Sequence, residues 1–481
     1  MRFLYQSIPL FKMAIFFLII SKLGLVYGIL LSLALHKFHM LLMEKFFKMI
    51  PLSPGDLNFV WLDDKDRYNL VLFLKFEEFN AEKIKNLLIE RGLKNFQKLR
   101  SRLRFKFFEF YWEEVKVEEA IKTIEIIKNN DEYCFNSNED ITKCSYKEIA
   151  KRIDIMNEFP FRFLIIENEK AKIKNTLFIK FDHSFSDGLG LIGLICGLAD
   201  NYSLDLFPGG FNKRHSILGF ICTFLMFPYL MLYSFYRNIF KITTKESPFK
   251  INYEKKAGHP KIQMTELMDF TEISKICKSL NITFNDMVMS IISSASKKYM
   301  EENNLKMPTH LSCLVPVSSR KPPATINEIL ITNDSTAIGC KIDIISDPIK
   351  ECNIIKNEFS SHVRNPYLFL FTKLMINSFF KFLPSYIMKE IILQNSKGID
   401  FTISNVPGPK SALYYSGSKV TELICYTSTG FLNSFLAVFS YNGTFRFVIC
   451  FDEALGLDVD KYTNILVNEI NYVSENINIK Y

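Results

Sequence analysis

The segment 182–188 has the sequence DHSFSDG and separates two apolar runs, Leu177–Phe181 before it and a run beginning at Leu189 after it. We predict a buried strand for the first run and the start of a helix for the second. A histidine that ends a strand and precedes an Asp-Gly turn lies at the rim of a sheet, where pockets form. The segment therefore favours an α/β fold in which a strand, a turn and a helix meet at His183.

The residue types in this turn suit general-base chemistry. An imidazole has an unperturbed pKa of roughly 6.5, so it can accept a proton from a hydroxyl and return it to a leaving group. Asp187 is expected to cap the following helix or to pair with an arginine that braces the turn, and Gly188 to adopt a backbone angle that a side chain would obstruct. We predict His183 as the catalytic base, with Asp187 and Gly188 as support. The alternative is a purely structural histidine.

Length, charge and cysteine usage bound the class of protein. A chain of 481 residues corresponds to two or three domains, and a hydrophobic content of 48% is enough for large cores. The net charge of +8 includes no long basic block, so we expect no nucleic-acid partner and favour an anionic membrane surface or a phosphorylated small molecule. The ten cysteines include no C-x-x-C pair, which predicts a reduced, cytosol-facing catalytic region without a metal cluster.

Two apolar segments suggest contact with a bilayer. Ala14–Leu35 is long enough to span one as a helix, with His36 and His39 as juxtamembrane residues. The alternative is a cleaved signal peptide with a small-residue site at Ser32–Ala34. Ile217–Phe235 carries no charged residue and is predicted either to lie on the membrane or to be a buried linker helix.

Local patterns place the remaining elements. Apolar and polar residues alternate over Tyr68–Phe76, which predicts a strand. We expect a solvated helix end over Phe96–Arg104 and a loop over Asn129–Lys143. A helix is expected over Tyr146–Met156. The sequence Asn442-Gly443 between two apolar runs predicts a β-hairpin.

The second half holds two further candidate sites. Thr283 is a plausible N-cap for a helix whose apolar residues recur at helical spacing, so Asn285 and Asp286 fall in its first turn. A strand over Ile399–Ser404 is expected to run into the turn that contains Asn405. An acidic residue in a first helical turn is also ordinary helix chemistry.

Taken together, these short motifs occur in an order that resembles the bifunctional wax ester synthase and diacylglycerol acyltransferase family, from about Pro51 to the C-terminus. The resemblance rests on Leu52–Asp56, His183–Gly188, Asn285–Asp286, Val315–Ser318 with Arg320, and Ser404–Pro409. It implies two chloramphenicol-acetyltransferase-like α/β subdomains with the active-site tunnel at their junction. The N-terminal membrane helix expected from the apolar run Ala14–Leu35 precedes them. The expected division is an anchor at 1–45, a subdomain at 46–206, a hydrophobic membrane-associating linker at 207–258 and a second subdomain at 259–481.

The resemblance also implies an activity. His183 occupies the second-histidine position of the family's H-H-x-x-x-D-G motif, whereas Asp182 replaces the first histidine, and Pro160–Arg162 replaces a Pro-Leu-Trp motif. Asp182, Ser404 and Asn405 are candidates for substrate binding, and Asn285 for polarising a reacting group. The resemblance implies acyl transfer from acyl-CoA to a fatty alcohol or diacylglycerol, with no cofactor.

Two alternatives to this activity stay open at this point. One is a condensation-type acyltransferase that acts on another alcohol or an amine, and the other is an inactive lipid-binding homologue. In each case we expect membrane lipid as a partner and a location at the endoplasmic reticulum, with the catalytic region facing the cytosol.

Overall fold

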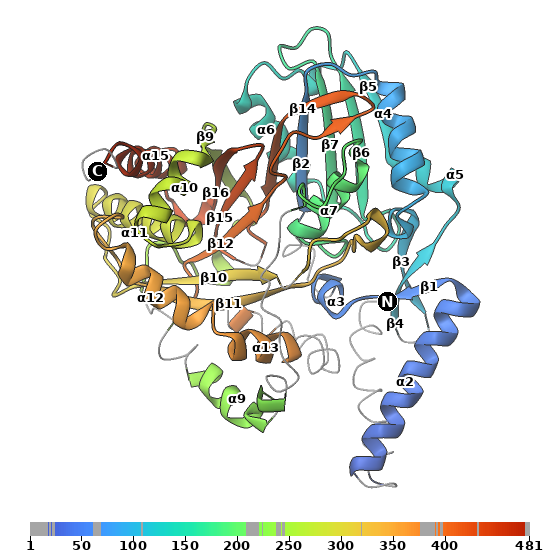
Figure 1. Cartoon of the computed structure of the whole chain (residues 1–481), viewed down its shortest axis with the longest axis horizontal. Helices are drawn as coiled ribbons and strands as arrows, with labels where there is room; N and C mark the ends of the chain where they lie inside the picture. Colours follow the sequence, from blue (N-terminus) through green and yellow to red (C-terminus); the bar gives the residue numbers. More distant parts are fainter. Residues whose placement is uncertain are drawn as a thin grey trace.

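Two sheets lie side by side in the computed structural model of the protein, one built mainly from the N-terminal half and one from the C-terminal half (Figure 1). This mixed α/β architecture agrees with the fold class that the sequence predicts. The structure describes every residue except 1–17, 19–20, 22–24, 61–68, 107–108, 208–220, 224, 237–241, 243–245, 319, 376–389, 391–392, 395–397, 431 and 477–481.

Within the described residues, the first sheet has six strands in the order β13-β14-β2-β7-β6-β5. All neighbours in it are antiparallel except β5 and β6. Its strands are β2 (Asn69–Phe76), β5 (Ile124–Lys128), β6 (Phe161–Glu167), β7 (Asn175–Asp182), β13 (Tyr414–Tyr415) and β14 (Ser418–Thr427). Because β7 lies between β2 and β6 and is buried along almost its whole length, its last residues are firmly held where the His183 turn begins.

The second sheet has the order β11-β10-β12-β15-β16-β8 in the described part of the chain, with β9 paired to β16. The pairs β10·β12 and β12·β15 are parallel and the others antiparallel. Its strands are β8 (Pro260–Met264), β9 (Met268–Asp269), β10 (Leu311–Ser318), β11 (Ser335–Ile342), β12 (Phe401–Pro407), β15 (Ser434–Tyr441) and β16 (Thr444–Asp452). A small third sheet joins β1 (Met49–Pro51), β4 (Glu109–Glu114) and β3 (Ser101–Lys106).

Helices cover these sheets. The α-helices are α2 (Leu25–Phe47), α3 (Pro54–Val60), α4 (Ala81–Leu87), α5 (Val117–Ala120), α6 (Asn138–Ala150), α7 (Gly188–Leu198), α9 (Phe227–Tyr236), α10 (Phe270–Ser279), α11 (Phe284–Glu302), α12 (Cys352–His362), α13 (Pro366–Leu374) and α15 (Val459–Glu475). Helix α7 contributes to the apolar core of the first half, whereas α11 and α15 contribute to the core of the second. Burial of these apolar faces is the main favourable contribution to folding.

The two halves are not separate along the chain. Strand β14 comes from the C-terminal half but pairs with β2 in the first sheet, from Val420 opposite Phe76 to Thr427 opposite Leu70, with a register shift between Val420 and Glu422. A third apolar cluster then joins the two sheets, with Phe73 and Tyr426 from the first and Val448 from the second. The predicted subdomain boundaries therefore miss a strand exchange between the halves.

Several local predictions are confirmed. The strand at β2 and the hairpin of β15 and β16 occur as expected, and both turn residues of the hairpin have positive φ angles, 48° at Asn442 and 80° at Gly443. This backbone conformation suits the twist of the paired strands. The ten cysteines, all of them among the described residues, form no disulfide bond with one another.

Other local predictions are wrong. The segment Phe96–Arg104 is not a helix end on the surface, because only Gln97–Arg100 forms a short 3-10 helix, named η3, and β3 follows at once. Two of its arginines, Arg100 and Arg104, pair with carboxylates of β4, and Arg104 lies 3.0 Å from Glu113. Part of the predicted loop Asn129–Lys143 is helical, because Ser137 closes a capping box that starts α6 at Asn138.

The predicted membrane-spanning helix is not supported. Within the part of the chain that the structure describes, no helix combines the length and the apolar character that a bilayer crossing needs. In the predicted segment Ala14–Leu35, most of the residues that precede Leu25 lie outside the described residues. The C-terminal half of α2 instead packs on the protein, where Met43 is buried against Met49 and His39 Nε2 lies 2.8 Å from the hydroxyl of Tyr111.

The two sheets are also joined by a buried ion cluster, which generates a prediction. Glu422 on β14 contacts both Lys75 on β2 and Arg446 on β16, and Arg446 is only 1% exposed. Substitution Glu422→Gln leaves a buried guanidinium without its carboxylate, so we expect unfolding free energy to fall by about 3 to 5 kcal/mol, measured by urea denaturation.

The matched control for this substitution uses a neighbouring exposed pair. Glu77 and Lys419 join the same two strands at the surface, 3.2 Å apart. Glu77→Gln is expected to cost no more than about 1 kcal/mol. Equal effects of the two substitutions would contradict the role given to the buried cluster.

Candidate active site

His183 follows directly on the last residue of β7 and opens a tight turn. Asp182 accepts hydrogen bonds from the backbone N–H and the hydroxyl of Ser184, at 2.9 and 2.5 Å, and its carbonyl accepts from the N–H of Phe185. Asp182 is only 2% exposed. Its carboxylate therefore stabilises the turn, and the suggested role in substrate binding stays a prediction.

Asp187 ends the turn and begins α7. Its carboxylate accepts a hydrogen bond from Gly190 N–H at 2.9 Å as the N-cap, and lies 3.1 Å from the Arg320 guanidinium. The other carboxylate oxygen accepts from the backbone N–H of Asp334 at 2.8 Å. The sequence suggested either a cap or an arginine pair, and the structure has both at once.

Gly188 has a different role from the predicted one. Its φ angle is not in the left-handed region, so no unusual backbone angle requires glycine there. A Cβ at this position would instead lie 3.2 Å from both methyl groups of Val406 on β12. Glycine therefore allows the start of α7 to approach the end of β12, and this contact brings the two halves together beside the His183 turn.

The imidazole of His183 is partly exposed and lies in apolar surroundings. Phe59 of α3 stacks on it with ring centroids 4.0 Å apart and planes 17° apart. Phe59 in turn packs with Leu432 and Leu314. Burial lowers the pKa of His183 below its ordinary value, and the negative charges of two nearby aspartates, Asp187 and Asp182, oppose that shift. A lowered pKa keeps the imidazole neutral, as a general base must be.

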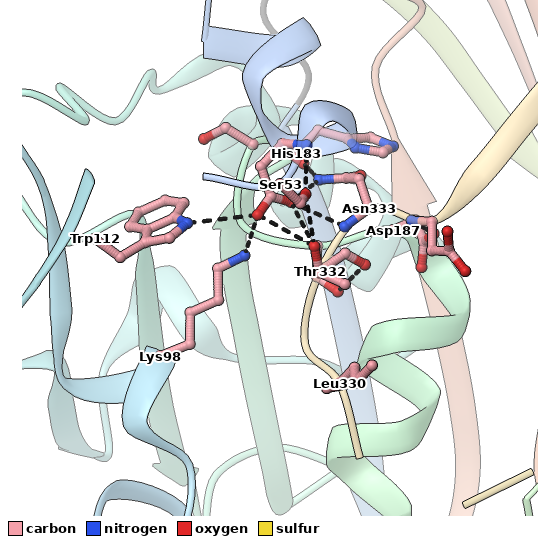
Figure 2. A network of polar contacts seen from close by, with 12 residues as sticks. Ser53, Lys98, Trp112, His183, Asp187, Leu330, Thr332 and Asn333 are labelled. Carbon is pink, nitrogen blue, oxygen red and sulfur yellow. Dashed lines mark hydrogen bonds and ion pairs between the residues drawn. The ribbon is translucent and has the colours of Figure 1, made fainter. Parts of the chain in front are cut away.

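The Leu52–Asp56 motif supplies a buried carboxylate beside this turn. Asp56 is 2% exposed, and its Oδ1 accepts hydrogen bonds from both the backbone N–H and the side-chain amide of Asn333, each at 2.8 Å. The hydroxyl of Thr332 donates to Asp56 and to Ser53. Figure 2 shows these contacts converging from α3 and from the segment that precedes β11. We call this set the Asp56 cluster, comprising Ser53, Asp56, Lys98, Trp112, Thr332 and Asn333.

Lys98 provides the counter-charge. Its ammonium lies 2.7 Å from Asp56 Oδ2 and 4.7 Å from the ring centroid of Trp112, whose Nε1–H also donates to Asp56, at 3.4 Å. The same ammonium lies 5.3 Å from the ring of Phe185 in the His183 turn. Burial lowers the pKa of Lys98, and the attraction of Asp56 opposes that shift. A paired charge in this position stabilises the surrounding segments, whereas an unpaired one would be costly.

The remaining predicted residues lie in the second half. Asn285, in the first turn of α11, accepts a hydrogen bond of 2.5 Å from the side-chain amide of Asn405 on β12. Asp286 closes a capping box with Thr283 and lies 2.6 Å from Arg364, which is a structural role. Ser404 and Asn405 are half-buried neighbours on β12. The predicted Asn285 and Asn405 therefore form one pair, and Val406, the next residue, contacts Gly188.

Sequence reasoning missed four residues that contact or support His183: Phe59, Lys98, Trp112 and Asn333. The Leu52–Asp56 motif entered the sequence analysis only through the family resemblance. A charged residue that follows a Pro-Gly pair and precedes apolar residues could have indicated a buried carboxylate that needs a partner. Asn333 belongs to none of the motifs that the sequence analysis singles out. Its contact with His183 depends on tertiary packing, so no local pattern indicates it.

With this geometry described, comparisons with known proteins become informative. Residues 336–473 match the protein-family model described as the WS/DGAT C-terminal domain. A segment of 164 residues is 25% identical to the O-acyltransferase WSD of Acinetobacter baylyi, covering 32% of this chain and 33% of that protein. These segments of the chain are similar to the WS/DGAT family. The match to this curated relative spans about a third of the relative's length.

Solved structures agree with the WS/DGAT fold. The wax ester synthase/diacylglycerol acyltransferase from Marinobacter aquaeolei matches with a TM-score of 0.59 at 16% identity, over 89% of this chain and 99% of that one. The trichothecene 15-O-acetyltransferase from Fusarium sporotrichioides gives 0.61 at 12% identity, over 89% and 95%. A starter condensation domain of rhizomide synthetase, in complex with C8-CoA, gives 0.57 at 8% identity, over 89% and 94%. At these identities the structural matches establish the fold alone.

The close approach of α3 to the segment before β11 generates a prediction about Gly55. A Cβ there would lie 2.0 Å from the carbonyl oxygen of Asn333, a backbone atom that cannot move alone. We expect Gly55→Ala to lower the unfolding free energy by about 1 to 3 kcal/mol and to speed hydrogen exchange at the Asn333 amide.

Gly92 is the matched control for this substitution. A Cβ at Gly92 meets only side-chain atoms, at 3.4 and 3.5 Å. Gly92→Ala is expected to leave hydrogen exchange at the Asn333 amide unchanged. If Gly55→Ala also leaves that exchange unchanged, the close approach of Gly55 to Asn333 is contradicted.

Proposed function

We propose that this protein is an acyl-CoA-dependent O-acyltransferase that forms wax esters or triacylglycerols. The observation that carries the proposal is the placement of His183: its partly exposed imidazole stacks on Phe59 at the end of β7, where Val406 of the second half reaches the turn. The match of residues 336–473 to the WS/DGAT C-terminal domain and the similarity to the O-acyltransferase WSD support the same activity. The predicted tunnel between the halves is part of this proposal.

The proposed reaction has no covalent acyl-enzyme. The neutral imidazole of His183 removes the proton from the acceptor hydroxyl while the hydroxyl oxygen attacks the thioester carbonyl carbon. The tetrahedral intermediate then collapses, the carbon–sulfur bond breaks, and the imidazolium protonates the departing thiolate. Ester and free CoA-SH result, and the histidine returns to its neutral form. Base assistance of this kind typically contributes about 100- to 10,000-fold.

Binding of the polar reacting groups is assigned to the second half. We propose that the Asn285 and Asn405 amides, joined by their hydrogen bond, polarise the thioester carbonyl or orient the acceptor hydroxyl. Ser404 is the adjacent candidate on β12. Asp182 is kept as a substrate-binding candidate of lower rank, because its carboxylate already accepts two hydrogen bonds from Ser184.

An amine acceptor is the second candidate. Its specific support is the similar match to a condensation domain, with a TM-score of 0.57 against 0.59 for the Marinobacter enzyme. An assay of the purified protein with labelled acyl-CoA distinguishes O-acylation from amine acylation. It compares separate panels of fatty alcohols, diacylglycerols and amines as acceptors. Product from amines alone would overturn the O-acyltransferase proposal.

The decisive substitution is His183→Ala. We expect it to reduce ester formation by at least about 100-fold, because the base is lost, while the thermal unfolding temperature changes little. His259, which is exposed, is the matched control, and His259→Ala is expected to keep full activity. Ester synthesis retained in His183→Ala would exclude the proposed base, and absence of any product from the unmodified protein would favour the inactive lipid-binding alternative.

We further propose that the protein works at a lipid surface. Two helices expose large apolar side chains: α2 exposes Phe38, Leu41 and Phe46, and α9 exposes Tyr229 and Leu232. Both helices project at the lower edge of the molecule in Figure 1. An apolar helix face of this kind suits insertion at the interface of a bilayer without crossing it. A surface of the endoplasmic reticulum that faces the cytosol remains our preferred location.

Vesicle binding tests the lipid-surface proposal. We expect Phe46→Ser combined with Leu232→Ser to lower the fraction of protein that sediments with anionic phospholipid vesicles, with the partition coefficient falling at least about tenfold. The matched control is Ile354→Ser on α12, which removes a 43% exposed apolar side chain elsewhere. Equal binding by the double variant and the unmodified protein would contradict the proposal.

A further inference from the structure

The ring of Phe59 lies flat on the imidazole of His183, and the proposed reaction does not yet use this contact. The ring centroids are 4.0 Å apart and the planes differ by 17°, so an aromatic ring covers one face of the imidazole. Phe59 comes from α3, whereas His183 follows β7. The stack is therefore a tertiary contact made directly on the proposed base.

Both halves of the fold contribute to the apolar cluster around Phe59. It packs with Leu314 of β10 and with Leu432, which lies in the connection between β14 and β15. Phe59 is half-buried, and Leu432 is 5% exposed. A water molecule is held stably only where several polar groups surround it. The covered face of the imidazole instead meets an aromatic ring that two leucines support, so water is disfavoured there.

Helix α3 is held near both of its ends, and this fixes the position of Phe59. In its first turn, Asp56 is 2% exposed and accepts two hydrogen bonds from Asn333, each of 2.8 Å. At its end, Val60 is 6% exposed in the core of the first half. Residues three apart lie on the same face of a helix, so the anchor at Asp56 also sets the direction of Phe59. The Leu52–Asp56 motif thereby places an aromatic ring on the base.

The chemistry of a general base makes water a competitor of the acceptor. A neutral imidazole that takes a proton from an alcohol can also take one from water. The water oxygen would then attack the thioester carbonyl carbon, the carbon–sulfur bond would break, and the imidazolium would protonate the thiolate. The products would be a free fatty acid and CoA-SH in place of an ester and CoA-SH. A transferase of this kind therefore has to keep water away from its base.

We propose that Phe59 determines whether the acyl group passes to the acceptor or to water. Stacked on His183, its ring holds the imidazole plane in one orientation and keeps water from the face that it covers. The hydroxyl that the base activates is then that of the lipid acceptor. This inference rests on the proposed function, because it concerns the selectivity of the same base. Phe59 takes no part in the proton transfer, so it is a positioning residue that sets specificity.

The experiment compares Phe59→Ala with Phe79→Ala in the full-length protein. Phe79 is also half-buried and has an aromatic partner, Phe76, with ring centroids 5.1 Å apart. Phe76 is the last residue of β2, whereas the first residue of that strand pairs with Asp182 beside the site. Both substitutions remove a ring from an apolar cluster and should lower the unfolding temperature. Phe79→Ala therefore controls for a loss of stability alone.

The deciding readout is the ratio of two products. The purified protein is given labelled acyl-CoA and a fatty alcohol, and labelled ester and labelled fatty acid are measured in the same reaction. For Phe59→Ala we expect the ratio of fatty acid to ester to rise at least about tenfold, because water reaches the base. Phe79→Ala should keep the ratio of the unmodified protein.

Phe59→Leu separates the flat ring from the apolar bulk, and it serves if Phe59→Ala does not fold. We expect its ratio of fatty acid to ester to rise at least about threefold, because leucine covers the imidazole less completely. A readout besides activity is the proton NMR spectrum of the His183 ring. Its signals should lose the ring-current shift from the stacked ring in Phe59→Leu and keep it in Phe79→Ala.

Two results would overturn the inference while the proposed function stands. One is an unchanged ratio of fatty acid to ester in the Phe59 variants, whether or not the rate of ester formation falls. The other is fatty acid release that persists when His183→Ala is combined with Phe59→Ala, because water would then be activated without the base.

Failure of the proposed function looks different. If His183→Ala alone still forms ester at the rate of the unmodified protein, the base assignment is wrong, and the role given to Phe59 falls with it. An unmodified protein that releases neither ester nor fatty acid from acyl-CoA would overturn both.

Discussion

A single buried carboxylate organises this part of the molecule. Asp56 is 2% exposed, and a charge in such a place is tolerated only when partners and hydrogen-bond donors surround it. The donors come from η3 through Lys98, from β4 through Trp112, and from the segment before β11 through Thr332 and Asn333. Because these segments are distant in sequence, satisfying one charge brings both halves of the fold to the His183 turn.

Close backbone packing strengthens the same convergence. The segment before β11 lies against α7, where a Cβ at Gly193 or Gly197 would crowd Ile329 at 3.1 or 2.7 Å. Asp334 donates to the N-cap carboxylate of α7 a few residues later. Residues of the C-terminal half thus help to form both ends of the turn that carries the histidine. The turn that carries His183 is therefore held by residues of both halves.

The features that the sequence predicted correctly are those that depend on neighbouring residues along the chain, such as strands, helix caps and turns. The strand, turn and helix around His183 follow from apolar runs and from the cap at Asp187, and the hairpin at Asn442 follows from a turn type. Long-range partners were not predictable. The arginines before β4 looked solvated because their glutamate partners lie on another strand, and β14 was missed because its partner is β2. The contacts of Asn333 are tertiary, so no local pattern predicts them. For Gly188 the sequence analysis predicted an unusual backbone angle, whereas the reason for glycine is its close packing against Val406.

The central claim is that a neutral His183 imidazole, with its pKa lowered by burial, accepts the proton of the acceptor hydroxyl. The most direct measurement is an NMR titration of 15N-histidine-labelled protein, with His183 assigned by its absence in the alanine variant, set beside the pH dependence of kcat/KM. The account predicts that His183 titrates below its unperturbed pKa of about 6.5 and that activity falls at the same pH, because protonation removes the base. An imidazole that titrates above that value would contradict the account. So would a kcat/KM that does not change over the pH range in which His183 titrates.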